Sequence, residues 1–161
     1  MSKKIHASCR DGARRAGSFD AQRVLEKVKG IADAGLIIAL ANSRDVHHEW
    51  ARRVAGEVTE PLLTCEPVLA EAAFHLRNVV LVLEMISEEL IVLSFDCGDH
   101  LPQLAALAKR YADREPDLAD LCLIRMSELY PNHRVITVDQ DFRIYRRNKR
   151  EVIPLISPPR R

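Results

Sequence analysis

The sequence GIADAGLIIALANSRDVHHEW, residues 30–50, decides the fold that we predict. A short apolar segment ends in Asp33, the small residues Ala34 and Gly35 follow, and an apolar run covers residues 36–41. This order predicts a buried strand that ends in a carboxylate and turns at once into a helix. Ligand sites in open α/β sheets lie at the carboxyl ends of the strands, so Asp33 is a candidate site residue. Because Asp is also common in turns, the interpretation depends on whether other acids occupy matching positions.

The composition is ordinary for a soluble globular protein. The chain has 161 residues, 47% hydrophobic and 29% charged, which predicts one domain with a core of useful size. A net charge of +1 and 5% aromatic residues argue against a polyelectrolyte binder and against a row of base-stacking rings. No apolar run reaches the roughly 18 residues of a membrane helix, and no signal-peptide core follows the basic N-terminus. We therefore expect a cytoplasmic protein with no membrane partner.

The chain divides by composition into three parts. Residues 1–29 are polar, basic and rich in small residues, and we expect them to be a loosely ordered lead. A compact domain is expected for residues 30–157, and residues 158–161 form a tail.

Four cysteines lie far apart in the sequence: Cys9, Cys65, Cys97 and Cys122. No two of them form a C-x-x-C pair, so the pattern is neither that of a zinc site nor that of a small disulfide framework. We therefore expect buried free thiols in a reducing compartment.

Helix and strand signals alternate along the rest of the chain. Periodic apolar residues predict helices at residues 45–60, 64–78, 79–90, 101–112 and 118–129. Asp45 and Thr64 are the expected N-caps of the first two. Apolar and β-branched runs predict strands at residues 91–95, 134–138 and 151–156. The pattern predicts an α/β fold with three layers, in which helices cover a mostly parallel central sheet.

Asp139 repeats the sequence context of Asp33, because it follows the apolar run 135–138. Two parallel strands that end in Asp place both carboxylates on one rim of the sheet. Glu71 lies at the edge of the apolar face of a predicted helix and could reach the same rim, although a solvated flank position is the simpler interpretation.

Asp120 lies in a predicted helix that is apolar on nearly every side. Its neighbours one turn away are Leu123 and Ile124, and no Lys or Arg lies on that face. A carboxylate among aliphatic side chains costs several kcal/mol unless something neutralises it. Asp117, which follows Pro116, has a structural alternative as the N-cap of this helix, but that role does not explain Asp120.

Four converging acids without basic partners repel one another, and a divalent cation would relieve that repulsion. Carboxylates are hard oxygen ligands of the kind that Mg²⁺ and Mn²⁺ prefer. Such a site activates water and stabilises the leaving oxygen in phosphodiester hydrolysis. The sequence thus favours a metal-dependent hydrolase.

Four segments resemble PIN-domain ribonucleases, in particular the VapC-type toxins of prokaryotic toxin–antitoxin systems. They are IADAGLIIALANSRDVHHEWA, TCEPVLAEAAF, EPDLADLCLIRMSE and VITVDQDFRIYRR, in the order of the family and spanning about residues 30–147. Each motif is weak alone, and the four in order make the resemblance specific. The first segment departs from the common pattern at Ala34, where the family often has Thr or Ser.

The resemblance implies a PIN-like domain and an endoribonuclease that depends on Mg²⁺ or Mn²⁺. It implies that the catalytic and metal-binding acids are Asp33, Glu71, Asp120 and Asp139. Asp117, one turn before Asp120, is implied as a further metal-binding acid. An RNA substrate, a cognate antitoxin that occupies the site, and a homodimer are implied as partners.

Two alternatives remain open. A PIN-like module without catalysis, which only binds RNA or a protein, would have lost one or more of the acids, whereas all four are present here. A nuclease that acts on DNA or in RNA maturation would use the same acids, so the sequence does not separate it from a toxin.

The densest basic cluster lies near the C-terminus and includes Arg143, Arg146, Arg147 and Lys149. It is either a solvated face or a surface that contacts RNA phosphates beside the acidic rim.

The helices predicted at residues 45–60, 64–78 and 79–90 carry more aliphatic surface than one small sheet needs. The surplus residues are Leu81, Val82, Leu83, Met85 and Ile86. They either complete the core of the monomer or form an apolar interface, for which two-fold self-association is the commonest arrangement.

Overall fold

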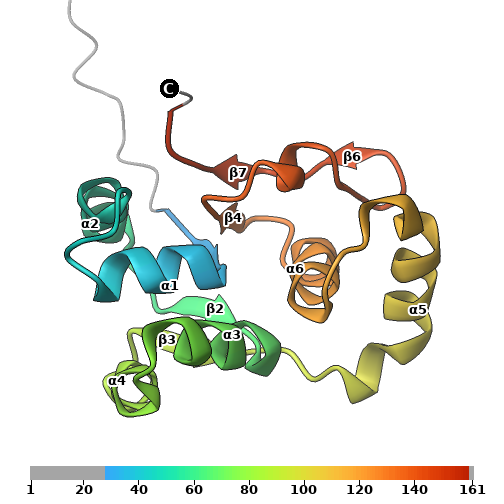
Figure 1. The fold of residues 1–161 in the computed structure, drawn as a ribbon. Coiled ribbons are helices and arrows are strands. Elements are labelled where there is room, and N and C mark those ends of the chain that lie inside the picture. The colour runs from blue at the N-terminus through green and yellow to red at the C-terminus, as the bar shows by residue number, and fades with distance from the viewer. Residues whose placement is uncertain (1–27, 160–161) are drawn as a thin grey trace, which may run out of the picture.

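Five parallel strands form the central sheet, in the order β3-β2-β1-β4-β7 (Figure 1). The computed structural model describes residues 28–159, so nearly all of the predicted N-terminal lead lies outside the described residues. Figure 1 shows α1 and α2 to the left of the strands and α5 and α6 to the right. This arrangement confirms the predicted three-layer α/β fold. No helix within the described residues is long and apolar enough to cross a membrane.

The strands of this sheet are short, and β1 lies at its centre. Their bounds are β1 (Gly30–Ala32), β2 (Leu62–Thr64), β3 (Ile91–Leu93), β4 (Arg134–Ile136) and β7 (Leu155–Ile156). Ile31 of β1 pairs with Leu63 on one side and with Val135 on the other. All residues of β1 are buried, as expected for a parallel strand that is covered on both faces.

Six α-helices surround the sheet. They are α1 (Ala34–Ala41), α2 (His48–Glu57), α3 (Glu66–Leu76), α4 (Val79–Ser87), α5 (Leu101–Arg110) and α6 (Leu118–Leu129). Three short 3₁₀ turns are η1 (Gly98–His100), η2 (Ala112–Arg114) and η3 (Asp141–Arg143). Helix α6 packs against β1 and β4, and seven of its residues are buried, as expected for a helix that is apolar on nearly every side.

Helix α2 is shorter than predicted, and Asp45 is not its N-cap. The Asp45 carboxylate accepts a hydrogen bond from the His47 backbone N–H (2.8 Å) in the turn before the helix. At the other end the helix stops at Glu57, because Val58 forms a parallel β-bridge with Val28.

Thr64 belongs to a strand that the sequence pattern did not reveal. It is the last residue of β2, and its buried hydroxyl donates to the Ala32 carbonyl of β1 (3.2 Å). Cys65 occupies the N-cap position of α3 instead. The prediction of Thr64 as a helix cap was therefore wrong.

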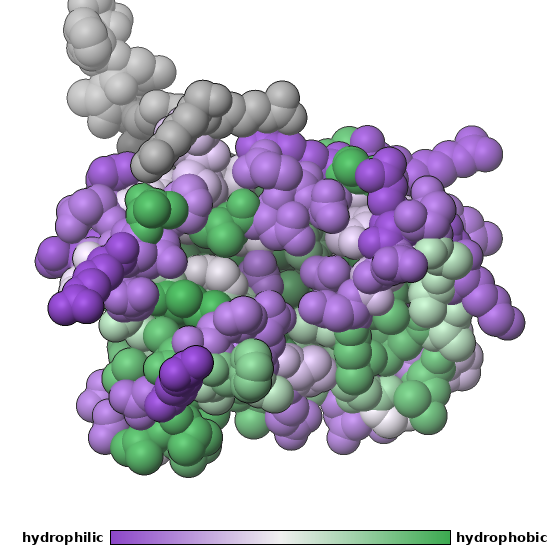
Figure 2. All heavy atoms as spheres, in the orientation of Figure 1, coloured by the Kyte–Doolittle hydropathy of each residue, from purple (hydrophilic) through white to green (hydrophobic). Residues whose placement is uncertain are grey.

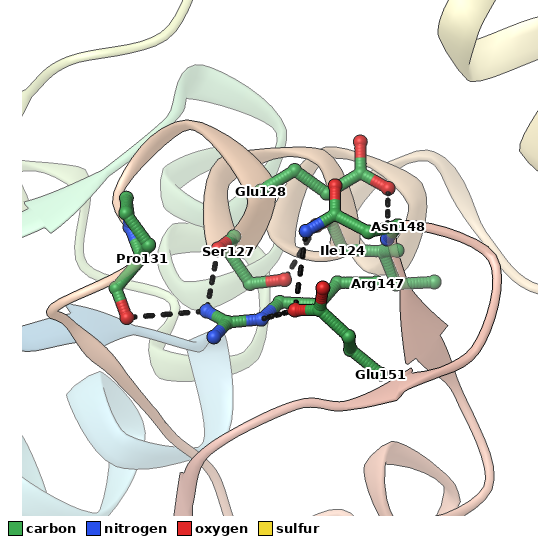
Figure 3. A network of polar contacts seen from close by, with 7 residues as sticks. All are labelled: Ile124, Ser127, Glu128, Pro131, Arg147, Asn148 and Glu151. Atoms are coloured by element: carbon green, nitrogen blue, oxygen red, sulfur yellow. Dashed lines mark hydrogen bonds and ion pairs between the residues drawn. The ribbon is translucent and has the colours of Figure 1, made fainter.

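Arg147 ties the C-terminal segment to α6 (Figure 3). It lies in β5 (Arg146–Arg147), which pairs antiparallel with β6 (Glu151–Val152), so the strand predicted at 151–156 divides into β6 and β7. Its guanidinium donates to the carbonyls of Ser127 (3.0 Å) and Pro131 (3.2 Å) and forms an ion pair with Glu151 (3.2 Å).

We predict that Arg147→Ala destabilises the fold, because two backbone carbonyls and one carboxylate lose a charged donor. The loss of unfolding free energy should be about 2–3 kcal/mol, measured by urea titration. Arg150→Ala is the matched control, since Arg150 is exposed in the same segment, and it should stay within about 0.5 kcal/mol of the parent. Equal effects of the two substitutions would contradict this role of Arg147.

Candidate active site

The order of the strands changes direction between β1 and β4. From β1 the chain adds β2 and β3 on one side, and it then crosses to add β4 and β7 on the other. Loops leave the carboxyl ends of two such strands in opposite directions, which opens the crevice where α/β proteins bind ligands. Asp33 directly follows β1, and Asp139 comes shortly after β4. The two predicted acids thus lie at this crevice.

Asp33 is the most buried of the acids, with 8% of its surface exposed. It is the N-cap of α1, and its carboxylate accepts hydrogen bonds from the Ala34 backbone N–H (2.6 Å) and from the Thr137 hydroxyl (2.5 Å). Burial raises the pKa of the Asp33 carboxyl, these two hydrogen bonds lower it, and the charges of Asp139 and Asp117 raise it further. The net pKa is above its usual value, despite the favourable position at a helix N-terminus.

Thr137 is a site residue that the sequence analysis missed. It has no exposed surface, and its hydroxyl donates to Asp33 while accepting the backbone N–H of Asp139 (2.9 Å). One side chain therefore joins the two acids that follow β1 and β4. The only sign of this role in the sequence was a single hydroxyl side chain within the apolar run 135–138. We interpreted that run only as a strand.

Asp117 and Asp120 form a capping box at the start of α6. The Asp117 carboxylate accepts the Asp120 backbone N–H (2.8 Å), and the Asp120 carboxylate accepts the Asp117 backbone N–H (3.3 Å). The N-cap role considered for Asp117 is correct, and Asp120 shares in the capping. Burial first, and then the charge of Asp117, raises the pKa of Asp120 to about 7, with smaller contributions from Asp139 and Asp33.

Glu71 reaches the same rim from α3. Burial raises the pKa of its half-buried carboxyl, and the charges of Asp117, Asp33 and Asp139 add to the effect. His75, one turn further along α3, acts in the opposite direction. Glu71 therefore lies within electrostatic range of the other acids.

Within the part of the chain that the structure describes, the acids form one electrostatic group without a compensating Lys or Arg. Among residues 28–159, no ion pair joins a Lys or Arg to any of the five carboxylates, which are Asp33, Glu71, Asp117, Asp120 and Asp139. A donor set made only of carboxylates fits a hard divalent cation such as Mg²⁺ or Mn²⁺.

The carboxylate oxygens are held by hydrogen bonds rather than pointed at one common centre. Within the described residues, no three side chains of His, Cys, Asp or Glu gather tightly enough to form a metal-ligating group. Asp33 is held by Thr137, Asp120 by the capping box, and Asp139 by the Asp141 backbone N–H (2.8 Å). A cation would have to draw some of these carboxylates out of their present contacts.

The four predicted RNA-binding residues divide into two kinds. Arg147 holds α6, and the guanidinium of Arg146 donates to the backbone carbonyls of residues 143, 144 and 145 (2.8 to 2.9 Å). Arg143 and Lys149 are exposed. Arg143 is the last residue of η3, which begins two residues after Asp139. Its guanidinium donates to the side chains of Gln140 and Ser157 (2.7 Å each).

In comparisons with known proteins, no family model and no curated protein matches this sequence. The PIN-domain resemblance accordingly rests on the four sequence segments alone.

We predict that the metal-free protein loses stability as Asp120 ionises. The folded carboxyl keeps its proton up to a pKa of about 7, whereas an unfolded Asp releases it near about 3.9. Ionisation between these values therefore favours unfolding. Asp120→Asn stays neutral and keeps an acceptor for the capping box. It should match the parent near about pH 3, where the carboxyl is protonated in both states, and exceed it by about 1–2 kcal/mol near about pH 8, a figure reduced for partial exposure.

Urea titrations at both pH values, with a chelator present, measure this difference. Asp113→Asn is the control, because the side chain of Asp113 is 76% exposed and pairs with Arg114. The control should show no gain that grows with pH. A difference between Asp120→Asn and the parent that stays constant across the range would contradict the prediction.

Proposed function

We propose that this protein is a metal-dependent endoribonuclease of the PIN-domain type and the toxin of a toxin–antitoxin pair. The observation that carries the proposal is the group of carboxylates at the crevice between β1 and β4. Burial and the neighbouring charges raise the pKa of Asp33, Glu71 and Asp120, and no Lys or Arg among residues 28–159 forms an ion pair with the group. Maintaining such a group costs stability, and a cation-binding role accounts for that cost. The order of the four sequence segments supports the choice of family.

The residues of the chain have distinct tasks in the proposed site. Asp33, Glu71, Asp120 and Asp139 hold the cation and the attacking water, and Asp117 supports them. Thr137 orients Asp33, in the way that an outer-shell partner fixes a ligating carboxylate. A bound Mg²⁺ or Mn²⁺ would lower the pKa of a water molecule and stabilise the leaving oxygen of the phosphodiester.

Arg143 is the best candidate among the basic residues for an RNA phosphate contact. It is exposed, it follows the Asp139 loop in η3, and its present partners are the neutral Gln140 and Ser157. Arg146 and Arg147 are engaged with backbone carbonyls, so they have less freedom to contact a ligand.

We predict that Glu71→Gln, Asp139→Asn and Asp120→Ala each abolish RNA cleavage. Thr137→Val should cost roughly 10–100-fold, since it removes a residue that only orients a ligand. Glu66→Gln is the matched control, because Glu66 is exposed in the first turn of the same helix as Glu71, and it should keep full activity. Cleavage of labelled RNA at several Mg²⁺ and Mn²⁺ concentrations measures the effect.

A second readout separates the competing functions. Mg²⁺ or Mn²⁺ should raise the unfolding temperature of the parent and of Glu66→Gln, but not that of Asp139→Asn. If the parent binds RNA without cleaving it, or if Asp120→Ala cleaves as well as the parent, the enzyme proposal is wrong. Preferential cleavage of DNA would favour the alternative nuclease. Mapping of cellular RNAs cut by the parent and not by Asp120→Ala would identify the substrate.

An exposed apolar patch on α3 and α4 supports the proposed homodimer. Val82 and Met85 are buried, whereas Leu83 is 56% exposed. The core therefore buries only some of the surplus aliphatic residues that the sequence analysis identified in α4. Further exposed apolar residues nearby are Phe74, Val79 and Val80. Figure 2 shows hydrophobic side chains gathered at the lower left, where Figure 1 places α4. Such a patch usually marks an interface.

We predict that Leu83→Glu converts the dimer to a monomer, because a charge at the centre of the patch cannot be desolvated without a partner. Light scattering at tens of micromolar protein measures the mass. Leu101→Glu is the control, since Leu101 is exposed to a similar degree (61%) at the start of α5, and this variant should remain dimeric. A parent that is a strict monomer would rule out the dimer.

The acidic crevice also suits the proposed antitoxin. An Arg from a partner protein could pair with the carboxylates and displace the cation, because guanidinium groups bind carboxylates strongly. A protein encoded next to this one should therefore copurify with it and suppress cleavage. A neighbour that does neither would count against the toxin–antitoxin assignment and leave the nuclease assignment intact.

A further inference from the structure

Three cysteines that are far apart in the sequence gather behind the acidic crevice. Cys65 stands at the N-cap of α3, Cys97 precedes η1, and Cys122 lies in α6, two residues after Asp120. The sulfur atoms of Cys97 and Cys122 are 3.4 Å apart. Cys65 lies beside Cys122 as well, and the side chains of these two cysteines are in contact.

We propose that Cys97 and Cys122 are a redox pair that forms a disulfide when the protein meets a peroxide. All three described cysteines are free thiols in this structure. Within residues 28–159 no three side chains form a metal-ligating group, so the thiols do not make a metal site as they stand. The proposal concerns a covalent modification that is separate from the proposed nuclease function.

The exposure of the three thiols determines which of them reacts first. Cys65 and Cys122 have no exposed surface, whereas Cys97 is partly exposed. A peroxide therefore reaches Cys97, whose sulfur attacks one peroxide oxygen. When the peroxide is H₂O₂, the O–O bond breaks, the thiol proton leaves with the departing hydroxide as one water molecule, and a sulfenic acid remains. The Cys122 sulfur then attacks the Cys97 sulfur, the S–S bond forms, and a second water molecule leaves. Two thiols are oxidised and one peroxide is reduced.

The surrounding contacts hold Cys97 in position for this step. Tyr130 of the segment after α6 donates to the Ser94 carbonyl (2.8 Å). The rings of Phe95 and His100 stack with centroids 4.8 Å apart, on either side of Cys97 in the chain. The two sulfurs must approach only about 1.4 Å further to reach the length of a disulfide bond, about 2.05 Å.

The disulfide would join the loop after β3 to the helix that carries Asp117 and Asp120. It links residues 25 positions apart, so it restricts the unfolded chain and raises stability. It would also prevent α6 and this loop from moving independently. Oxidation of the two thiols would therefore restrain the helix that lines one side of the crevice.

Mass spectrometry of the full-length protein tests the proposal directly. The protein is treated with H₂O₂, quenched with acid, alkylated and digested with trypsin. Each described cysteine then lies in its own peptide: residues 54–77 for Cys65, 78–109 for Cys97 and 115–125 for Cys122. We expect a linked pair of 78–109 and 115–125, with the loss of two hydrogen atoms, and its disappearance on reduction with dithiothreitol.

Cys97→Ser and Cys65→Ser provide the matched comparison. Cys97→Ser should abolish the linked pair, and Cys65→Ser should leave it in place. Oxidation should raise the unfolding temperature by several degrees in the parent and in Cys65→Ser, but not in Cys97→Ser. Any one of three results would overturn the proposal. These are a disulfide between Cys122 and Cys65, a disulfide that joins Cys97 to Cys9 or to a second molecule, and the persistence of three free thiols. None of these readouts depends on nuclease activity.

Discussion

The buried hydrogen bond between the Thr137 hydroxyl and the Asp33 carboxylate is the contact on which the crevice depends. It joins the start of α1 to the end of β4 across 104 positions of sequence. The same hydroxyl accepts the Asp139 backbone N–H, so the ends of the two central strands are held at one atom. The helices that carry the remaining acids contact the elements that this bond joins, because α6 packs against β1 and β4 and α3 packs against α1.

The main constraint on the site is the cost of keeping several carboxylates together. Burial and mutual repulsion raise the pKa of Asp33, Glu71 and Asp120. Hydrogen bonds offset part of the cost at two places, the N-terminus of α1 and the capping box of α6. These contacts serve helix formation and charge stabilisation at once, which explains why Asp33, Asp117 and Asp120 stand at helix starts, whereas Glu71 lies within α3.

The sequence predicted the parts of the fold that have long or regular patterns. The bounds of α6 were predicted correctly because twelve residues of consistent apolarity leave little freedom, and the acids after β1 and β4 were found because each ends an apolar run. Strand β2 was missed, since three residues between Pro61 and Cys65 show no periodicity.

Tertiary contacts without a local pattern could not be predicted. Thr137 looked like an ordinary strand residue, and its importance comes from a partner that is distant in the chain. Arg146 and Arg147 have the sequence appearance of a basic surface, yet their guanidinium groups satisfy backbone carbonyls. The contact between Cys97 and Cys122 likewise exists only because η1 and α6 meet in space.

The sequence separation of the acids has a consequence for synthesis of the protein on the ribosome. A growing chain emerges from its N-terminus, so Asp33 appears long before the strand that supplies its buried hydroxyl partner. Strand β1 lies between β2 and β4 in the sheet. It therefore lacks one of its two neighbouring strands until β4 has left the exit tunnel. The nascent chain therefore carries no complete crevice until β4 has emerged, and whatever chemistry the crevice performs begins only after that point.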